Sequence, residues 1–320
     1  VFEQFIRLLI HCGLDPNDLD YIHCRGTNMG ALIAEAADTI RLVQFTGSSA
    51  VAERVAATMH GKVRLEDAGF DWKIIGPDFD ASWLDYVAWQ CDEDAYNATG
   101  QKCSAQSVLF AHENWAEALY PRLGELAARR SLDDLTVGPV LTWSTERIAA
   151  HIDAVLAVDG ARLLFGGKPL SDHTIPDCFG AWQPTAVEVP LAAFESEHFE
   201  LLASELFGPF QVVVTWRDGE LDRVLTLFER MQNHLTAAVV SADIGFQNRV
   251  LGTTVNGTTY CGMRARTTGA PQNHWFGPSG DPRGAGIGTP EAIQLTWSAH
   301  REIILDNGPQ PAGWSVPPVR

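Results

Sequence analysis

The stretch "NATGQKCSAQSVLF", residues 97–110, places a cysteine where it could act as a nucleophile. A Gly-Gln turn precedes Cys103 and exposes it, and Lys102 and nearby backbone N–H groups could stabilise a thiolate, the form of cysteine that attacks electrophiles. The alternative is a small, inert, buried side chain, as most cysteines are. The local sequence leaves both interpretations open.

A second segment, "RLEDAG", contains a candidate general base. Glu66 lies at the end of an apolar strand, before a glycine loop, where partial loss of solvent raises the pKa of a carboxyl group toward a useful range. A solvated acid at a strand end is the alternative.

A third segment, "FTGSSAVAERV", suits a phosphate. A predicted strand ends at Gly47, and a helix follows at once with Ser48 or Ser49 as its N-cap. Such a helix N-terminus directs N–H groups and the positive end of the helix dipole at a ligand. A capped helix after a strand is also common in α/β proteins, and the G-x-G-x-x-G motif is missing here.

The composition excludes several classes of function. With a formal charge of −17 and a pI of about 4.9, the chain has no basic stripe for a nucleic-acid partner. Its apolar runs are far shorter than the roughly 20 residues that cross a bilayer, so no membrane span is expected. Six scattered cysteines and ten histidines form no ligand motif, which predicts no metal and a reducing compartment. A small-molecule substrate is expected.

Helical and strand patterns alternate, which predicts an α/β fold with parallel strands, in two domains or one large unit. Strands are predicted over 41–47, 62–69, 105–113, 161–167, 209–216 and 235–241. Helices are predicted over 1–14, 48–61, 84–96, 115–131, 146–158 and 220–232. Residues 252–292 are rich in Gly, Pro, Thr and Asn, and we expect a functional or disordered loop there.

The segments "FTGS", "LE" followed by glycine, "GQKC" and "ELFGPF" occur in this order, and at all four the chain resembles the aldehyde dehydrogenase superfamily. "RLEDAGFDWKIIGPD" and "RTTGAPQNHWFGPSGDPRGAGIGTPEAI" look like the plant-type Δ1-pyrroline-5-carboxylate (glutamate semialdehyde) dehydrogenases. The resemblance implies the C-terminal half of a Rossmann-like NAD-binding domain at 1–69 and a complete α/β catalytic domain at 70–280. It implies an anchor loop and an oligomerisation segment at 281–320.

By this resemblance Cys103 is the nucleophile, which forms a thiohemiacetal with the aldehyde and, after hydride passes to NAD+, a thioester. Glu66 matches the base that activates water for hydrolysis. Gly47 and Ser48 match the pyrophosphate-binding turn. Glu205 matches the residue that binds the nicotinamide ribose, and Phe207 the ring beside it.

Relatives bind the carboxylate of this substrate with backbone amides of a glycine-rich anchor loop. The matching segment "PRGAGIG" makes Gly284, Ala285 and Gly286 the candidates, with Arg283 as a charge partner and Phe276 as an aromatic wall. A plain ordered surface loop is the alternative.

The chain also departs from the family pattern. It starts with Val rather than Met, and we expect residues to be missing before residue 1, including the oxyanion-hole asparagine and the residues that distinguish NAD from NADP. Asp67 and Ala68 replace residues of the more usual Leu-Glu-Leu-Gly-Gly.

These features predict NAD-dependent oxidation of L-glutamate γ-semialdehyde to glutamate in proline catabolism. The resemblance implies a homodimer or larger homo-oligomer in the mitochondrial matrix. One alternative is a truncated, catalytically incompetent paralogue or fragment that acts as a subunit-interaction module. Another is an enzyme that acylates coenzyme A, which Glu66 disfavours because such relatives usually lack that base.

Overall fold

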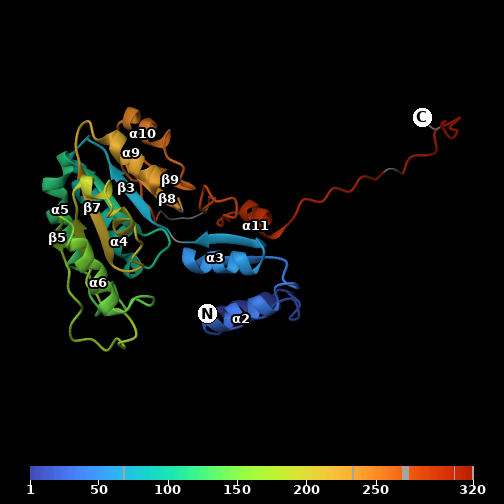
Figure 1. Cartoon of the computed structure of the whole chain (residues 1–320), viewed down its shortest axis with the longest axis horizontal. Coiled ribbons are helices and arrows are strands. Elements are labelled where there is room, and N and C mark those ends of the chain that lie inside the picture. The colour runs from blue at the N-terminus through green and yellow to red at the C-terminus, as the bar shows by residue number, and fades with distance from the viewer. Residues whose placement is uncertain (68, 233, 269–273, 306, 319–320) are drawn as a thin grey trace.

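The computed structural model of the chain describes residues 1–67, 69–232, 234–268, 274–305 and 307–318. It contains a small unit with a two-stranded sheet and a larger unit built on a seven-stranded sheet (Figure 1). Within the described ranges, no helix is both long and apolar enough to span a bilayer. Ala68, one of the variant positions noted above, lies outside these ranges.

The small unit is built around one strand–helix–strand crossover. Strand β1 (Val43–Gly47) pairs in parallel with β2 (Val63–Asp67), and α3 (Ser49–Thr58) connects them. Helices α1 (Phe2–His11) and α2 (Gly26–Glu35) precede them. A small apolar cluster joins α3 to β2.

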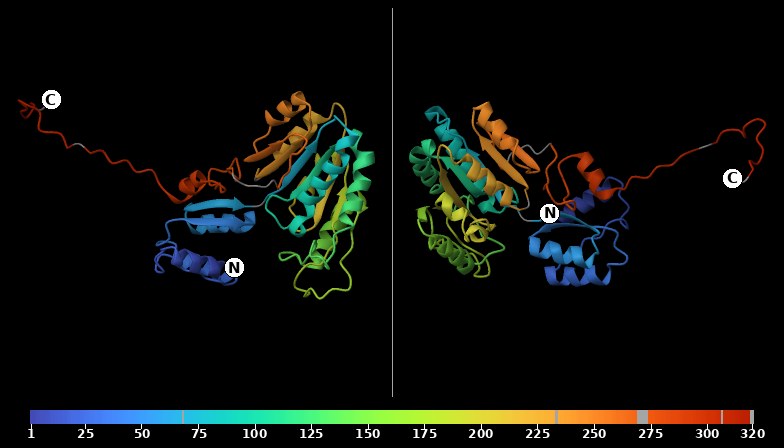
Figure 2. Two further views of the ribbon diagram at one scale, coloured as in Figure 1. Left: turned by 180° about the vertical axis from the view of Figure 1, so that it is seen from behind. Right: turned by 45° about the horizontal axis from the view of Figure 1, so that its top comes forward.

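The C-terminal part of the chain returns to this unit. Helix α11 (Pro290–Trp297) lies on one face of the two-stranded sheet, and α3 covers the other (Figures 1 and 2). Beyond α11 the described residues extend away from both units and are exposed.

The larger unit is one sheet between two layers of helices. Its strands are β3 (Asp71–Ile75), β4 (Gln106–His112), β5 (Arg162–Phe165), β6 (Thr185–Glu188), β7 (Phe210–Trp216), β8 (Thr236–Val240) and β9 (Thr258–Cys261). They lie in the order β5-β6-β7-β4-β3-β8-β9, and all pairs are parallel except β5 with β6.

The helices of this unit cover both faces of the sheet. They are α4 (Leu84–Tyr96), α5 (Glu113–Ala127), α6 (Thr145–Leu156), α7 (Leu191–Phe194), α8 (Phe199–Leu202), α9 (Leu221–Arg230) and α10 (Ile244–Leu251), with 3₁₀ turns at Ala81–Trp83 and Asn97–Gly100. One core cluster joins the sheet to α4 and α5, and another joins it to α6, α9 and α10.

The predicted α/β fold with parallel strands is confirmed, and the helix predicted over 84–96 is α4. Three strands were not predicted: β3, β6 and β9. Strand β3, "DWKII", is central and fully buried although it begins with an acid and contains Lys73. Strand β9 lies within residues 252–292, so the expectation of a loop throughout that range is wrong.

A buried ion pair explains how a lysine is accommodated in the central strand. Lys73 Nζ lies 2.8 Å from Asp94 Oδ2 in α4, and both side chains are fully buried. Asp94 also accepts hydrogen bonds from Arg266 Nε and from the backbone N–H of Thr267, each at 2.8 Å. Burial alone would raise the pKa of Asp94, but the two cations outweigh it and lower this pKa. Asp94 therefore joins β3, α4 and the segment after β9.

This arrangement predicts unequal effects of two substitutions in α4. Asp94→Ala should lower the free energy of unfolding by about 3–5 kcal/mol, because it leaves Lys73 buried without a counter-charge. Asp85→Ala removes an ion pair with Arg122 in which the Asp85 side chain is 80% exposed. It should cost less than about 1 kcal/mol. Urea unfolding of both variants measures the difference, and equal losses would contradict the prediction.

Candidate active site

The turn before Cys103 has an uncommon backbone conformation. Helix α4 is followed by three residues with left-handed φ angles, Ala98 (55°), Thr99 (60°) and Gly100 (67°). Such conformations persist where the surrounding structure holds them. Here the side chains of Thr99 and Gln101 bind the backbone of residues 138–141 through hydrogen bonds of 2.8–2.9 Å. The turn is thus fixed from outside, and it places the cysteine just before β4.

Glycines allow three distant segments to meet at this turn. A Cβ on Gly100 would lie 2.2 Å from the carbonyl oxygen of Gly208, in "ELFGPF". A Cβ on Gly69, just after β2, would lie 2.2 Å from the carbonyl oxygen of Cys103. Real Cβ atoms do not approach oxygen this closely, so only glycine fits at either position. These contacts bring the segments of the predicted base, nucleophile and ribose-binding acid together.

Cys103 is half-buried, and its thiol lies beside the carboxyl group of Glu66, which is 8% exposed. Burial raises the pKa of the thiol far above its ordinary value, and Glu66, Asp71 and Glu205 raise it further. The expectation that Lys102 and backbone groups favour a thiolate is therefore wrong for this structure, because carboxyl groups dominate the surroundings of the sulfur. The proton stays on sulfur, with Glu66 placed to accept it.

Asp71 is not among the predicted site residues. It opens β3, is fully buried, and accepts the backbone N–H of Thr236 in β8 at 2.6 Å through Oδ1. Burial raises its pKa well above the ordinary value, the bond from Thr236 opposes this rise, and Glu205 and Glu66 add to it. The sequence feature that could have pointed to Asp71 is an acidic residue at the first position of the apolar run "DWKII".

The predicted phosphate-binding turn lies at the N-terminus of α3. Gly47 ends β1, and Ser48 is the N-cap residue of this ten-residue helix. The Ser48 side chain makes no capping hydrogen bond and is exposed. The hydroxyl and the positive end of the helix dipole therefore fit a phosphate group of a dinucleotide.

Glu205 lies close to this helix. It lines a cavity of about 180 Å³ together with Ser49 of α3 and Phe70. Burial raises the pKa of Glu205 to about 8, against the effect of a hydrogen bond from the Gly69 N–H. Phe207, two residues further on, is half-buried. A carboxylate that accepts hydrogen bonds fits the hydroxyl groups of a ribose here.

The predicted anchor loop pairs with the strand that carries Glu66. The N–H of Leu65 donates to the carbonyl of Arg283 at 2.8 Å, and the N–H of Ala285 donates to the carbonyl of Leu65 at 3.0 Å. The Gly284 N–H donates to a carbonyl within the loop at 2.9 Å. Two of the three amides expected to bind a substrate carboxylate thus have acceptors inside the chain. The Arg283 guanidinium, the expected charge partner, binds Glu53 of α3 at 2.7 Å.

The aromatic residue expected as a wall is buried instead. Phe276 is 1% exposed, and its backbone pairs with Ile287. Its neighbour Trp275 is 37% exposed and packs on Gly286, where a Cβ would lie 2.0 Å from the indole Nε1. Trp275 is therefore the exposed ring beside the loop.

Residues 1–281 match the sequence model of the aldehyde dehydrogenase family. The chain belongs to this family. It is 56% identical to the mitochondrial Δ1-pyrroline-5-carboxylate dehydrogenase 12A1 of Arabidopsis thaliana and 59% identical to a probable aldehyde dehydrogenase of Linum usitatissimum. Both matches cover 99% of this chain and 57% of the relative, so the chain spans a little over half the length of these relatives.

Solved structures agree with this assignment. The fold is similar to that of bifunctional proline utilization A, with a TM-score of 0.73 and 28% identity over 90% of this chain and 28% of that one. Aldehyde dehydrogenase 21 from Physcomitrella patens, in complex with succinate, has a TM-score of 0.65 at 19% identity, over 80% of this chain and 51% of that one. At that identity the match shows the fold alone. The resemblance found in the four sequence motifs is confirmed for the family.

The left-handed turn yields a prediction that separates steric contact from backbone strain. Gly100→Ala should lower the rate of NADH formation at least about 100-fold, because the new methyl group displaces the nucleophile turn from Gly208. Gly61→Ala is the matched control: Gly61 also has a positive φ, 78°, but a Cβ there meets nothing within 4 Å. It should lose about 1–2 kcal/mol of stability and little activity. Equal losses of activity in the two variants would contradict the steric argument.

Proposed function

We propose that the protein is an NAD-dependent dehydrogenase that oxidises L-glutamate γ-semialdehyde to glutamate in proline catabolism. The observation that carries the proposal is the meeting of Cys103, Glu66 and Glu205 at one buried site, from segments far apart in the sequence. The similarity to a plant Δ1-pyrroline-5-carboxylate dehydrogenase and to proline utilization A supports this substrate.

The residues of the site can perform the two halves of this reaction. Glu66 accepts the thiol proton, and the sulfur of Cys103 adds to the aldehyde carbon to form a thiohemiacetal. The backbone N–H of Cys103 stabilises the resulting oxyanion in the water-poor site. When bound at Ser48 and Glu205, NAD+ supplies the hydride acceptor. After releasing its proton to solvent, Glu66 activates the water that hydrolyses the thioester.

The proposal extends to assembly and location. The exposed segment after α11 contains Ile303, Ile304 and Leu305, whose apolar side chains suit a contact with a second subunit. We therefore propose a homodimer or larger homo-oligomer. The relative from Arabidopsis thaliana is named mitochondrial, which supports the mitochondrial matrix.

The decisive assay is NADH formation by the 320-residue chain with the semialdehyde, compared with propanal. Cys103→Ala should abolish NADH formation. Glu66→Gln should give one slowed turnover and then stall at the thioester, with a steady-state loss of at least about 100-fold, because Gln cannot transfer the protons. The stalled acyl group is detectable by mass spectrometry.

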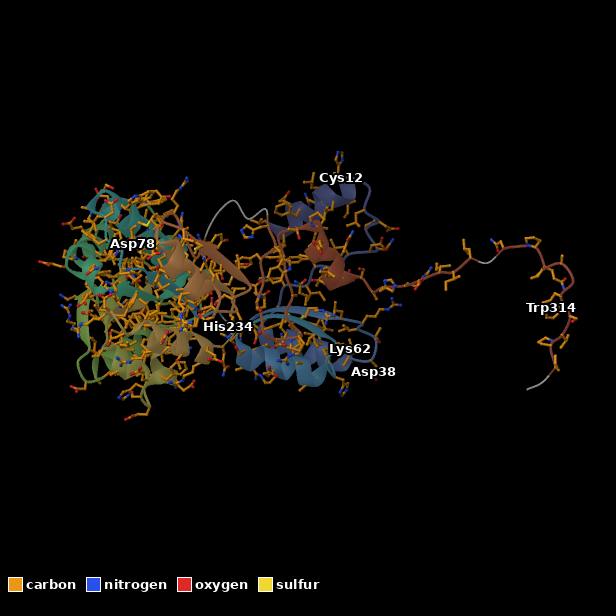
Figure 3. The ribbon with its side chains drawn as sticks, turned by 90° about the horizontal axis from the view of Figure 1, so that it is seen from above. Cys12, Asp38, Lys62, Asp78, His234 and Trp314 are labelled. Carbon is orange, nitrogen blue, oxygen red and sulfur yellow. The ribbon has the colours of Figure 1, made fainter. Side chains whose placement is uncertain are left out.

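Cys12→Ala is the control, since Cys12 is exposed beyond α1 and lies in the small unit (Figure 3). It should retain wild-type turnover. An unchanged steady-state rate in Glu66→Gln would remove Glu66 from the mechanism. NADH formation that requires coenzyme A would favour the acylating alternative, and a folded sample that forms no NADH would favour the subunit-interaction module.

The pKa of Glu205 makes cofactor binding dependent on pH. In the free protein this carboxyl is protonated below a pH of about 8, and a protonated carboxyl accepts ribose hydrogen bonds poorly. Affinity for NAD+ should therefore rise as pH increases toward 8, by at most about tenfold for each pH unit, and then level off. Glu205→Gln should bind more weakly with no such rise. Titration calorimetry from pH 6.5 to 9 tests this, and a pH-independent wild-type affinity would contradict it.

A further inference from the structure

We propose that Asp71 is a positioning residue of the catalytic site: its buried, uncharged carboxyl group holds the Gly69 backbone on which the Cys103 turn rests and adds no second anion beside the thiol. The proposal deepens the function proposed above and rests on Cys103 as the nucleophile. It concerns a residue that none of the sequence motifs included.

The first support is the place of the Asp71 carboxyl group. Oδ1 accepts the Thr236 N–H, which fixes the group between β3 and β8. A Cβ on Gly69 would lie 3.0 Å from Oδ2 and 2.2 Å from the carbonyl oxygen of Cys103. The carboxyl group therefore packs against the same Gly69 backbone on which the nucleophile turn rests. Any change in its size or hydration is transmitted through one residue to Cys103.

The second support is the lack of stabilisation for a negative charge. Oδ2 is buried and accepts no hydrogen bond from a described residue, and the buried Thr236 hydroxyl, which also has no partner there, lowers the pKa of the carboxyl group by less than burial raises it. A buried carboxylate with one oxygen unsatisfied is costly, whereas the protonated form is neutral. By contrast, the Cys103 thiol lies beside Glu66, and the backbone N–H of Gly69 lowers the pKa of Glu205, which also lines a cavity.

The charged groups around Asp71 lead to the same conclusion. Glu66 and Glu205 approach it from the ends of β2 and of the loop before β7, and both oppose a further negative charge. The nearest cation along β3, Lys73, is paired with Asp94. On the side of β8, burial lowers the pKa of His234, which keeps that ring neutral. Carboxyl groups clustered in a water-poor site share protons, and the most buried one retains its proton most readily.

A neutral Asp71 has a consequence for the thiol. If it were ionised, its negative charge would face the sulfur and oppose formation of the thiolate. As a neutral group it holds the Gly69 backbone and leaves Glu66 as the single base in contact with the thiol. Asp71 thus acts through Gly69 and the local charge, without contacting the substrate.

The test is the rate at which iodoacetamide alkylates Cys103, followed by mass spectrometry of its peptide across pH 6–10. Asp71→Asn is nearly isosteric, permanently neutral, and keeps an acceptor for the Thr236 N–H. Its alkylation rate at pH 7 should be within about twofold of wild type, because neither protein has a charge at position 71. At any higher pH at which Asp71 of the wild type ionises, Asp71→Asn should react faster. A rate at pH 7 at least about tenfold above wild type would overturn the proposal, since it would show that Asp71 carries a charge.

Asp78→Asn is the matched control. Asp78 follows β3 at its opposite end, accepts the N–H of Ala242 at 2.7 Å, and lies away from His234 and the small unit (Figure 3). It should leave the alkylation profile unchanged over the whole pH range. If both variants showed the same increase in alkylation rate at high pH, the effect of Asp71→Asn would be a general loss of structure, and the proposal would be overturned.

A second measurement is made first on protein that retains Asp71. In Glu205→Gln protein, the infrared spectrum at pH 7 should retain a protonated-carboxyl band, and this band should be absent from the spectrum of the Glu205→Gln, Asp71→Asn double variant. A band that is missing from Glu205→Gln protein at pH 7, or that the double variant retains, would overturn the proposal. Neither measurement uses the semialdehyde. If the semialdehyde is not the substrate, only the NADH assay will show it, and the conclusion about Asp71 will be unaffected.

Discussion

The close contact between the backbone of Gly69 and the carbonyl of Cys103 is the constraint on which the site depends. It joins the end of the strand that carries the proposed base to the turn that carries the proposed nucleophile. Any side chain at position 69 would separate them. The left-handed turn at residues 98–100 serves the same contact from the other side, because it lets Gly100 pack on the segment of Glu205. The site is thus assembled by backbone packing, and its side chains are placed by that packing.

This dense assembly accounts for the electrostatics. Backbone segments in contact exclude water, and the acidic side chains that they carry share a medium in which like charges repel strongly. The raised pKa values of Cys103, Asp71 and Glu205 are one consequence. In the proposed mechanism, the reaction begins when a proton moves from the sulfur of Cys103 to Glu66. A more open site would ionise the thiol more easily and would lose the exclusion of water that strengthens its hydrogen bonds.

The sequence predicted what depends on local pattern. The amphipathic spacing of α4 and the apolar run of β4 can be recognised without knowing what they pack against, and the order of the motifs made Cys103 and Glu66 the candidates for nucleophile and base. Strand β3 could not be predicted from the sequence, because Lys73 and Asp71 are residue types that usually lie on the surface. Their burial depends on the pairing of Lys73 with Asp94 and of Asp71 with Thr236. The hydrogen bonding of the anchor-loop amides likewise depends on Leu65, which lies far away in the sequence. The burial of Phe276 depends on its pairing with Ile287.

The pairing of the anchor loop with β2 gives the loop a second role. Since the backbone of Leu65 binds the loop on both sides of Gly284, the loop lies alongside β2, in which the next residue is Glu66. The ion pair of Arg283 with Glu53 fixes the same loop to α3, the helix that begins at the phosphate-binding turn. In the proposed function, a substrate that contacts this loop would lie beside the elements that carry the proposed base and the predicted phosphate-binding turn. Their relative geometry is fixed by contacts within the chain, which is the preorganisation that the proposed two-step reaction requires.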